Sequence, residues 1–492
     1  MRALAALLLL AAPGLAAFWS GPVAVGLPQG YGMSIAALGG SAYLYYTALG
    51  NGPGLSGLVL SGPSYAVAPA PRTGGPAASP YVFQLSNGSL AMLWIGLGPA
   101  GSSSLEMSIL SAAGWSAPVG LISGGVVLAY ASDGRLVYAV WQPAPDPTYA
   151  SSRLVVIYPN GSRLSLREPG LVGLNGAYSG GAMAVFANGT YAVVGPDGSA
   201  RRVEAQYAGL SPGGLYVLSG GVLRYGNASL EVPWASAAAP VEGCGGPFAV
   251  AWSASGRVAV YAPGGLSLRN FAVPGAVWSV GAVCAGGFLY VAVESVANHS
   301  GSIWVAVVPT TPAKPSISAS ASGPIASVAW SVPYPEEYNV TSTTLLVYIN
   351  GALAAERPVA PRGTAAYEMS KPGNYTFVLL VSTPFGNATA SATLISNATA
   401  TTAAPQTAAT QTPTATTSAA TAATEVATST QPQTSKAAGG HGLAYALAGT
   451  AAIAVALIAW LAVGRRRGAG PRRGSADAPD GARHSRRSRR RP

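Results

Sequence analysis

Residues 124–141 read GGVVLAYASDGRLVYAVW. Two glycines lead into an apolar segment, Asp133-Gly134 supplies a tight turn, and a second apolar segment follows. Short apolar segments rich in Val and Tyr, joined by Asp-Gly, are typical of β-hairpins. This stretch therefore predicts two antiparallel strands joined by a two-residue turn.

The same pattern recurs loosely between residues 39 and 309. Copies begin at residues 39, 80, 124, 180, 213, 245 and 286, so the steps are 32 to 56 residues. Each copy has room for three or four strands, which is the content of a β-propeller blade. The repeat resembles generic bacterial and archaeal propeller repeats, without a WD, kelch or Asp-box signature. We expect an all-β fold in which residues 18–309 form a six- or seven-bladed propeller. Two or three stacked β-sandwiches are the alternative, although no Pro/Ser-rich linker divides the segment.

The chain has two cysteines, and both fall in this repeat region. Cys244 directly precedes one glycine pair, and Cys284 stands two residues before the next. Equivalent positions on adjacent blades approach each other near a propeller axis, so we predict a Cys244–Cys284 disulfide. Two thiols alone do not make a closed zinc site.

Residues 313–397 predict a separate β-sandwich. Its expected strands are SISAS, IASVAWSV, TTLLVYI, TAAYEM, NYTFVLLVST and NATASATLI. Trp330 lies among alternating apolar residues, Pro333 and Pro335 make a bend, and Tyr375 opens the penultimate strand. These features resemble a fibronectin type III module. The resemblance covers this segment alone and implies a spacer or a protein-binding unit.

The two ends of the chain predict a single-pass membrane protein. Residues 1–17 have one positive charge and a short apolar run, which is typical of a signal peptide. Residues 398–440, rich in Thr, Ala and Pro, predict a disordered stalk. Residues 441–464 contain an uncharged run long enough for one transmembrane helix. The arginines of residues 465–492 follow it, so the positive-inside rule puts this basic tail in the cytoplasm and the N-terminus outside the plasma membrane.

The net charge of +11 does not indicate nucleic-acid binding. Residues 465–492 contain eleven Arg and two Asp, so the tail carries +9 and the remaining chain only +2. A nearly neutral folded part has no basic surface to attract phosphates. We expect no nucleic-acid partner.

Nine of the thirteen asparagines begin Asn-x-Ser/Thr sequons, which predicts an N-glycosylated exterior. Asn-Gly sequences also form hairpin turns, and three of the sites fit that alternative as well. The nine predicted acceptors are Asn87, Asn160, Asn188, Asn227, Asn298, Asn339, Asn374, Asn387 and Asn397.

The sequence offers little catalytic chemistry, and we expect no catalytic residue, cofactor or metal. Residues 18–442 contain only His299 and His441. Asp133, Asp146 and Asp197 stand in Asp-Gly or Asp-Pro sequences and are interpreted as turn formers.

Glutamates are scattered over different units, with Glu336-Glu337 the one adjacent acidic pair. Aromatic residues divide into two sets by position. Those within strands are expected to pack between blades. Those near loops could stack on sugar rings, although core packing is favoured over ligand stacking. The strand set is Trp94, Trp141, Trp252, Trp278 and Trp304, and the loop set is Tyr45, Tyr46 and Tyr149.

Three functions remain open from the sequence. The excess of Arg over Lys (24 to 3), the sequons and the Thr-rich stalk resemble archaeal cell-surface proteins. The favoured function is a membrane-anchored recognition or scaffolding protein that binds protein or glycan through its propeller face. The alternatives are a surface-anchored carbohydrate-active enzyme and a structural subunit of the cell envelope. A small-residue face in the span also permits a homodimer. That face consists of Ala444, Ala448, Ala452 and Ala456.

Overall fold

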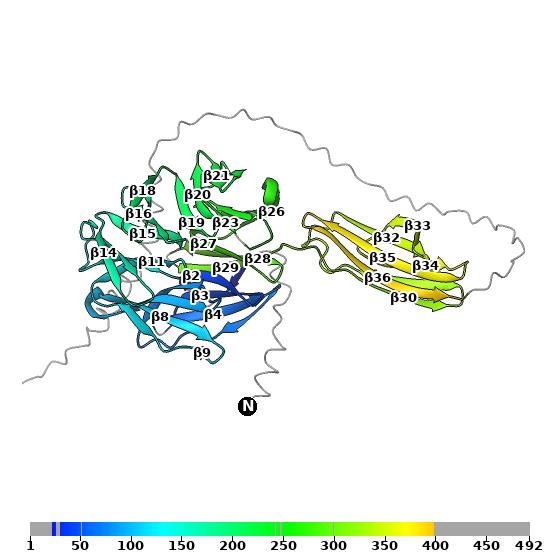
Figure 1. The fold of residues 1–492 in the computed structure, drawn as a ribbon, viewed down its shortest axis with the longest axis horizontal. Helices are drawn as coiled ribbons and strands as arrows, with labels where there is room; N and C mark the ends of the chain where they lie inside the picture. Colours follow the sequence, from blue (N-terminus) through cyan, green and yellow to red (C-terminus); the bar gives the residue numbers. More distant parts are fainter. Residues whose placement is uncertain are drawn as a thin grey trace, which may run out of the picture.

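The computed structural model describes residues 22–25, 30–50, 52–241, 243–246, 248–298 and 300–397. This part is almost entirely β structure, with two short 3-10 turns, η1 (Pro99–Gly101) and η2 (Pro263–Gly265). Figure 1 shows a body of radiating sheets beside an elongated sandwich. Within the described ranges no helix is long and apolar enough to cross a membrane. The predicted signal peptide, stalk, transmembrane helix with its alanine face, and basic tail all lie outside those ranges.

Seven antiparallel sheets follow one another along residues 23–309. In the first six sheets the four main strands pair in chain order, so that each sheet is one meander. Sheets of four strands repeated around an axis define a β-propeller. The prediction of a propeller is thus confirmed, and the blades number seven in the part of the chain that is described.

The first four blades occupy residues 30–203. Blade 1 consists of β2 (Gly30–Leu38), β3 (Ser41–Leu49), β4 (Pro53–Ser61) and β5 (Ser64–Ala68). Blade 2 consists of β6 (Ala77–Gln84), β7 (Leu90–Leu97), β8 (Ser103–Ser111) and β10 (Val119–Ile122), with the short β9 (Gly114–Trp115) also paired to β8. Blade 3 consists of β11 (Val126–Ser132), β12 (Val137–Gln142), β13 (Arg153–Ile157) and β14 (Arg163–Arg167). Blade 4 consists of β15 (Leu171–Tyr178), β16 (Gly181–Phe186), β17 (Tyr191–Val194) and β18 (Ala200–Val203).

The last three blades occupy residues 207–309 together with the N-terminal strand. Blade 5 consists of β19 (Tyr207–Ser211), β20 (Gly214–Ser219), β21 (Val222–Tyr225) and β22 (Ala228–Glu231). Blade 6 consists of β23 (Ala237–Val241), β24 (Phe248–Trp252), β25 (Arg257–Tyr261) and β26 (Ser267–Ala272). Blade 7 consists of β27 (Ala276–Ala285), β28 (Phe288–Ala297), β29 (Ser300–Pro309) and β1 (Val23–Val25).

The ring is closed by the N-terminal strand. β1 pairs antiparallel with β29, with Val23 opposite Val305 and Val25 opposite Ile303. The outermost strand of blade 7 therefore comes from the opposite end of the propeller sequence. Opening the ring would expose Val25, which is buried against blade 1.

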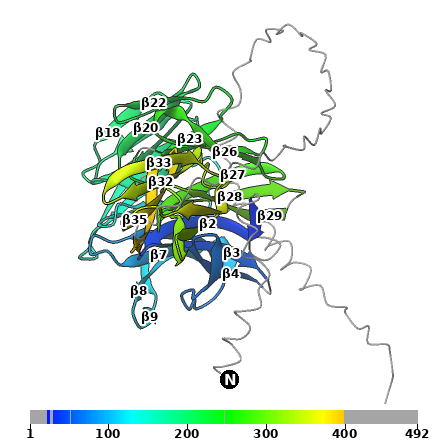
Figure 2. The same cartoon turned by 90° about the vertical axis from the view of Figure 1, so that its right-hand side faces the viewer.

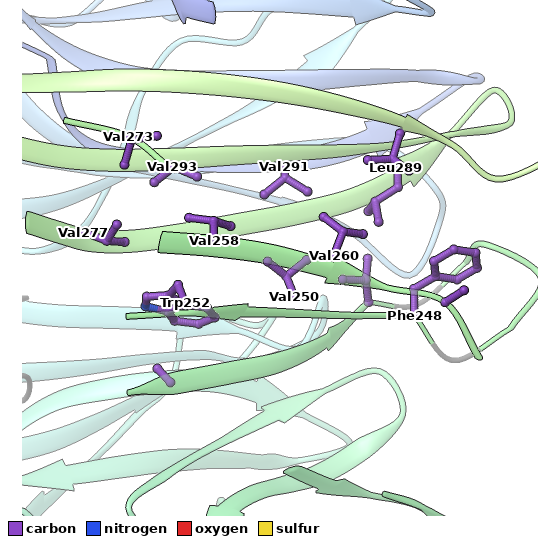
Figure 3. Close-up of a cluster of buried hydrophobic side chains, with 14 residues drawn as sticks. Phe248, Val250, Trp252, Val258, Val260, Val273, Val277, Leu289, Val291 and Val293 are labelled. Carbon is purple, nitrogen blue, oxygen red and sulfur yellow. The ribbon is translucent and has the colours of Figure 1, made fainter. Parts of the chain in front are cut away.

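Both faces of a blade are buried, which explains why the strands are apolar at nearly every position. In β12, Val137 and Ala139 belong to the core shared with blade 2, whereas Tyr138 and Val140 belong to the core shared with blade 4. Successive side chains of a strand point to opposite faces, so one short strand supplies two interfaces. Figure 3 shows the corresponding layer of aliphatic side chains between blades 6 and 7.

The sequence repeat and the blades are out of phase. Five of the seven expected starts, at residues 39, 180, 213, 245 and 286, fall in the turn between the first and second strands of a blade. The start at residue 80 falls inside β6, and the start at residue 124 falls between blades. The glycine pairs thus mark tight turns and not blade boundaries, because a turn needs their backbone freedom wherever it lies.

Residues 316–396 form two further sheets packed face to face. One has the order β30-β31-β34 and the other β33-β32-β35-β36, and a single core joins them. The strands are β30 (Ser316–Ser322), β31 (Ile325–Ser331), β32 (Ser342–Ile349), β33 (Ala352–Pro358), β34 (Arg362–Glu368), β35 (Gly373–Thr383) and β36 (Gly386–Ser396).

Two aromatic residues anchor the sandwich. Trp330 is buried and its indole N–H donates to the carbonyl of Ala360 at 2.9 Å. Tyr375 is fully buried, and its hydroxyl donates to the carbonyl of Lys371 at 3.0 Å and accepts from the Lys371 N–H. These bonds give the indole N–H of Trp330 and the hydroxyl of Tyr375 a partner, as most buried polar groups in proteins have.

The sandwich joins the propeller at blade 7. Thr310, directly after β29, donates its backbone N–H to the carbonyl of Gly287 at 2.9 Å. The aromatic rings of Phe288 and Tyr338 pack against each other, with their centroids 6.4 Å apart. Seen from the sandwich end, the blades fan out behind it (Figure 2).

Candidate functional site

The propeller has two unlike faces. The turns that join first to second strands lie on the face where Thr310 leaves for the sandwich, as Gly40 and Gly287 show by lining one cavity with Thr310. We call this the sandwich face. The opposite face carries the turns between second and third strands and the connections between blades, and we call it the free face.

A cavity of about 350 Å³ lies on the free face over blade 2. Its walls come from the β5–β6 connection, from the end of β7 and the start of β8, and from Gly124. Volumes of this order accommodate small ligands. The lining residues are Thr73, Gly74, Gly75, Pro76, Trp94, Gly96, Leu97, Gly98, Ser102, Ser103, Ser104, Glu106 and Gly124.

Four lining residues project from one face of blade 2. Trp94 stands opposite Glu106 across the β7–β8 ladder, and Gly96 stands opposite Ser104. Residues two apart on a strand share a face, so the side chains of Trp94, Ser104 and Glu106 lie together beside the Gly96 backbone. Gly96 makes room here, because a Cβ at that position would meet Ser104 Oγ at 2.5 Å and Glu106 Oε1 at 2.6 Å.

The hydrogen bonding of this group is incomplete. Glu106 Oε1 accepts from the Ser104 hydroxyl at 3.1 Å. Trp94 is fully buried, and its indole N–H has no hydrogen-bond partner among the described residues. A buried donor without a partner costs roughly 1–3 kcal/mol. The cavity thus combines a carboxylate acceptor with an unpaired indole donor.

Glu294 is the buried carboxylate of the described propeller, and it lies where blade 7 packs against blade 1. Its side chain accepts from the Ser279 hydroxyl at 2.8 Å and from the Gly32 N–H at 3.2 Å. Burial raises the pKa of Glu294, and these hydrogen bonds partly offset the rise. The sequence showed a glutamate within an apolar strand, but nothing in it indicated burial across two blades.

A second cavity, of about 520 Å³, lies on the sandwich face and includes the disulfide. Cys244 and Cys284 are bonded as predicted, with Cα atoms 5.3 Å apart, and they link blades 6 and 7. The lining contains no charged side chain and Gln84 is its one amide. Such a surface offers little chemistry for a specific ligand.

The tryptophans pack as expected in part. Trp94 and Trp252 are buried, while Trp141, Trp278 and Trp304 are half-buried.

The suggestion that Tyr45 and Tyr46 stack on sugars is wrong. Both side chains are buried, and Tyr45 donates its hydroxyl to the carbonyl of Pro69 at 3.1 Å. They lie in the middle of β3, so their place in the tertiary packing outweighs their closeness to a loop in sequence. Tyr149 is half-buried.

The three aspartates interpreted as turn formers each accept hydrogen bonds from residues of the turn that follows them. Asp133 Oδ1 accepts from the backbone N–H of Leu136 at 2.7 Å, and Asp197 Oδ1 accepts from the Ser199 hydroxyl and N–H. The same Ser199 bonds lower the pKa of Asp197. A hydrogen bond from the Thr148 hydroxyl, with further bonds from Ser151, lowers the pKa of Asp146. Across the described residues no group of three or more His, Cys, Asp or Glu could hold a metal ion.

All nine sequon asparagines are exposed. Asn87, Asn160 and Asn188 also make the turns of the alternative interpretation, since each Oδ1 accepts a backbone N–H two residues ahead. Exposure satisfies the steric condition for a glycan acceptor at every site. Of the five on the propeller, only Asn188 and Asn298 lie on the free face, and both stand in turns between second and third strands.

The fold defines the class, a seven-bladed β-propeller followed by a two-sheet sandwich. No protein family and no curated protein matches the sequence. Solved structures are similar over part of this chain. One is the extracellular domain of a putative one-component system from B. thetaiotaomicron, at 7% identity over 75% of this chain and 58% of that chain, with a TM-score of 0.39.

Two other solved structures are similar. The extracellular domain of a putative hybrid two-component system from B. thetaiotaomicron has 11% identity over 75% of this chain and 55% of that chain, with a TM-score of 0.34. The Cps50 (Swd1) β-propeller domain of Myceliophteria thermophila has 10% identity over 58% of this chain and 98% of that chain, with a TM-score of 0.39. The match thus spans little more than half the length of the two B. thetaiotaomicron domains.

Proposed function

We propose that this protein is a membrane-anchored recognition protein of the cell surface, which binds its ligand through the free face of the propeller. One observation carries the proposal: the sandwich leaves from the opposite face, at Thr310. β36 begins next to Pro312, at Gly386, and ends at Ser396. An extended strand of eleven residues spans roughly 35 Å, so the predicted stalk and anchor start at the far end of the sandwich from the propeller.

The sandwich supports the role of a spacer. Its strand order, first-second-fifth in one sheet and fourth-third-sixth-seventh in the other, supports the proposal of a fibronectin type III-like module. The Tyr375 hydroxyl bonded back to Lys371 matches the tyrosine corner of such sandwiches. The exposed sequons and the disulfide are consistent with an exported ectodomain.

We propose binding and not catalysis. Glycoside hydrolysis commonly uses two carboxylates that flank the scissile bond. The cavity on the free face has one, Glu106.

The test uses the full chain in lipid nanodiscs and envelopes isolated from the cells that produce it. A single cysteine carries a large polyethylene glycol, either on the free face (Arg72→Cys) or on the sandwich face (Ala113→Cys); both positions are exposed. We expect saturable binding that is lost with the Arg72→Cys conjugate and kept with the Ala113→Cys conjugate. Absence of saturable binding, or equal loss with both conjugates, would refute the proposal.

A further inference from the structure

Blades 2 and 3 repeat one local arrangement. In each, a tryptophan of the second strand stands opposite a charged residue of the third: Trp94 opposite Glu106 in blade 2, and Trp141 opposite Arg153 in blade 3. In each, a glycine pair stands just ahead of the first strand, in the connection from the preceding blade. Those pairs are Gly74-Gly75 and Gly124-Gly125. The two blades thus provide an internal comparison of the same site.

In blade 3 the glycine pair and the arginine cover the tryptophan ring. The Trp141 indole N–H donates to the carbonyl of Gly124 at 2.7 Å, and the Arg153 guanidinium lies 6.0 Å from the ring centroid. A Cβ on Gly125 would stand 2.7 Å from Trp141 Nε1. The glycine pair therefore lies directly on the indole and leaves no room for a ligand.

In blade 2 the arrangement is open. The equivalent indole N–H, that of Trp94, is buried without a partner in the described structure. A Cβ added to Gly74 or Gly75 would meet no atom within 4 Å, and the 350 Å³ cavity includes both glycines and Trp94 in its lining. A carboxylate, Glu106, takes the place of the arginine that covers the ring in blade 3.

The hydrogen-bonding groups and the charge of this cavity disfavour ionic ligands and favour a ligand that both donates and accepts hydrogen bonds. Glu106 accepts hydrogen bonds and the Trp94 N–H donates one, and no Lys or Arg lines the cavity. An ammonium group has only donors, so it would leave the indole N–H unpaired. A phosphate or carboxylate has only acceptors and would be repelled by Glu106. A hydroxyl group both donates and accepts, and neighbouring hydroxyls satisfy both residues at once.

We propose that the cavity between the Gly74-Gly75 connection and the Trp94–Glu106 pair binds the vicinal hydroxyls of a saccharide. One ligand hydroxyl donates to Glu106 and another oxygen accepts from the Trp94 indole N–H. The Ser104 hydroxyl already fixes one oxygen of Glu106, which orients the carboxylate. This inference rests on the proposed recognition function and names its ligand class and its site.

The experiment is calorimetric titration of the full chain in nanodiscs with four monosaccharides: D-glucose, D-galactose, D-mannose and N-acetyl-D-glucosamine. Butylamine and inorganic phosphate serve as comparison ligands. We expect at least one sugar to bind with a millimolar Kd and neither comparison ligand to bind. Binding by none of the four sugars, which leaves water as the occupant, overturns the proposal, as does tighter binding of butylamine.

Variants locate the site. Trp94→Phe removes the N–H together with the rest of the five-membered ring of the indole, and Glu106→Gln keeps the shape and removes the charge. Each is expected to weaken sugar binding about tenfold, the effect of one hydrogen bond. Trp252→Phe makes the same loss at a buried tryptophan of blade 6, outside the cavity lining, and should change the Kd less than twofold. Unchanged binding by Trp94→Phe and Glu106→Gln refutes the site.

Failure of this inference is distinguishable from failure of the proposed function. If the Arg72→Cys conjugate blocks envelope binding but no sugar binds, recognition by the free face stands and the saccharide site falls. If the full chain does not bind the isolated envelopes, the proposed recognition function is itself refuted.

Discussion

The Ser279 hydroxyl donates to Glu294 Oε2 at 2.8 Å, deep in the interface where blade 7 meets blade 1. The second carboxylate oxygen accepts from the Gly32 N–H on the neighbouring blade. Ser279 and Glu294 belong to the first and second strands of blade 7. One buried carboxyl group is therefore hydrogen-bonded to both blade 7 and blade 1, the last and first blades of the ring.

This carboxyl makes stability depend on pH. Because its pKa is raised in the folded state, the folded protein keeps the proton at pH values where the unfolded chain has lost it. The free energy of unfolding should therefore fall as pH rises from the ordinary glutamate pKa through the raised one. Glu294→Gln should remove that decline and be more stable than the native protein at pH 8. Urea unfolding between pH 4 and pH 8 measures it, with Glu231→Gln as an exposed control; parallel curves for native protein and Glu294→Gln would contradict the prediction.

The disulfide should contribute strongly to stability. Cys244 and Cys284 are 40 residues apart, and closing such a loop stabilises a fold by about 4 kcal/mol on the chain-entropy account. Cys284→Ser should lower the free energy of unfolding by that amount, and reductant should lower the native protein to the same level. Urea midpoints with and without dithiothreitol test both statements. A loss below about 1 kcal/mol would mean that the disulfide does not restrain the unfolded chain as that account assumes.

Closure by the N-terminal strand can be tested at Val25. Its side chain is 4% exposed and packs with Ile303 and blade 1, so Val25→Ala should cost about 2 kcal/mol. The neighbouring Ala24 is exposed, and Ala24→Ser should change stability by less than about 0.5 kcal/mol. Thermal unfolding of the two variants is the measurement. Equal stability would show that β1 does not hold the ring closed.

The glycine pair of blade 3 offers a matched comparison. Gly124 and Gly125 both have positive φ, at 75° and 71°. Gly124→Ala meets open space and should cost about 1 kcal/mol from the backbone alone. Gly125→Ala would also bring a methyl group into collision with the Gln142 carbonyl oxygen, and should cost about 3 kcal/mol. Urea unfolding of both variants checks the difference, and equal losses would show that the connection moves aside freely.

Several features of the fold were predictable because they depend on neighbours in sequence. Turn glycines, Asp-Gly pairs and apolar runs located most strands of the blades, and six of the seven sandwich strands. The missed strand was β33, whose side chains are mostly exposed at a sheet edge, so its sequence ALAAERP has no alternating apolar pattern. The phase of the repeat was missed as well, since a glycine turn looks the same within a blade as between blades.

The candidate site was predictable only in its parts. Trp94 was interpreted as core, correctly for its burial, and Glu106 as one of several scattered acids. Their adjacency depends on the register of β7 against β8. A usable signal did exist, because Trp94 and Trp141 follow a glycine pair at similar distances and each occupies the fifth position of its strand.

Sequence by itself determined where the chain turns, which segments extend, and which two cysteines can meet, because each of these depends on local backbone preference or on a repeat. Tertiary structure decided the number of blades, the pairing of Val23 with Val305, and which of two equivalent tryptophans keeps an unpaired N–H. Those outcomes depend on contacts between residues far apart in the chain, and the sequence pattern does not encode such distances.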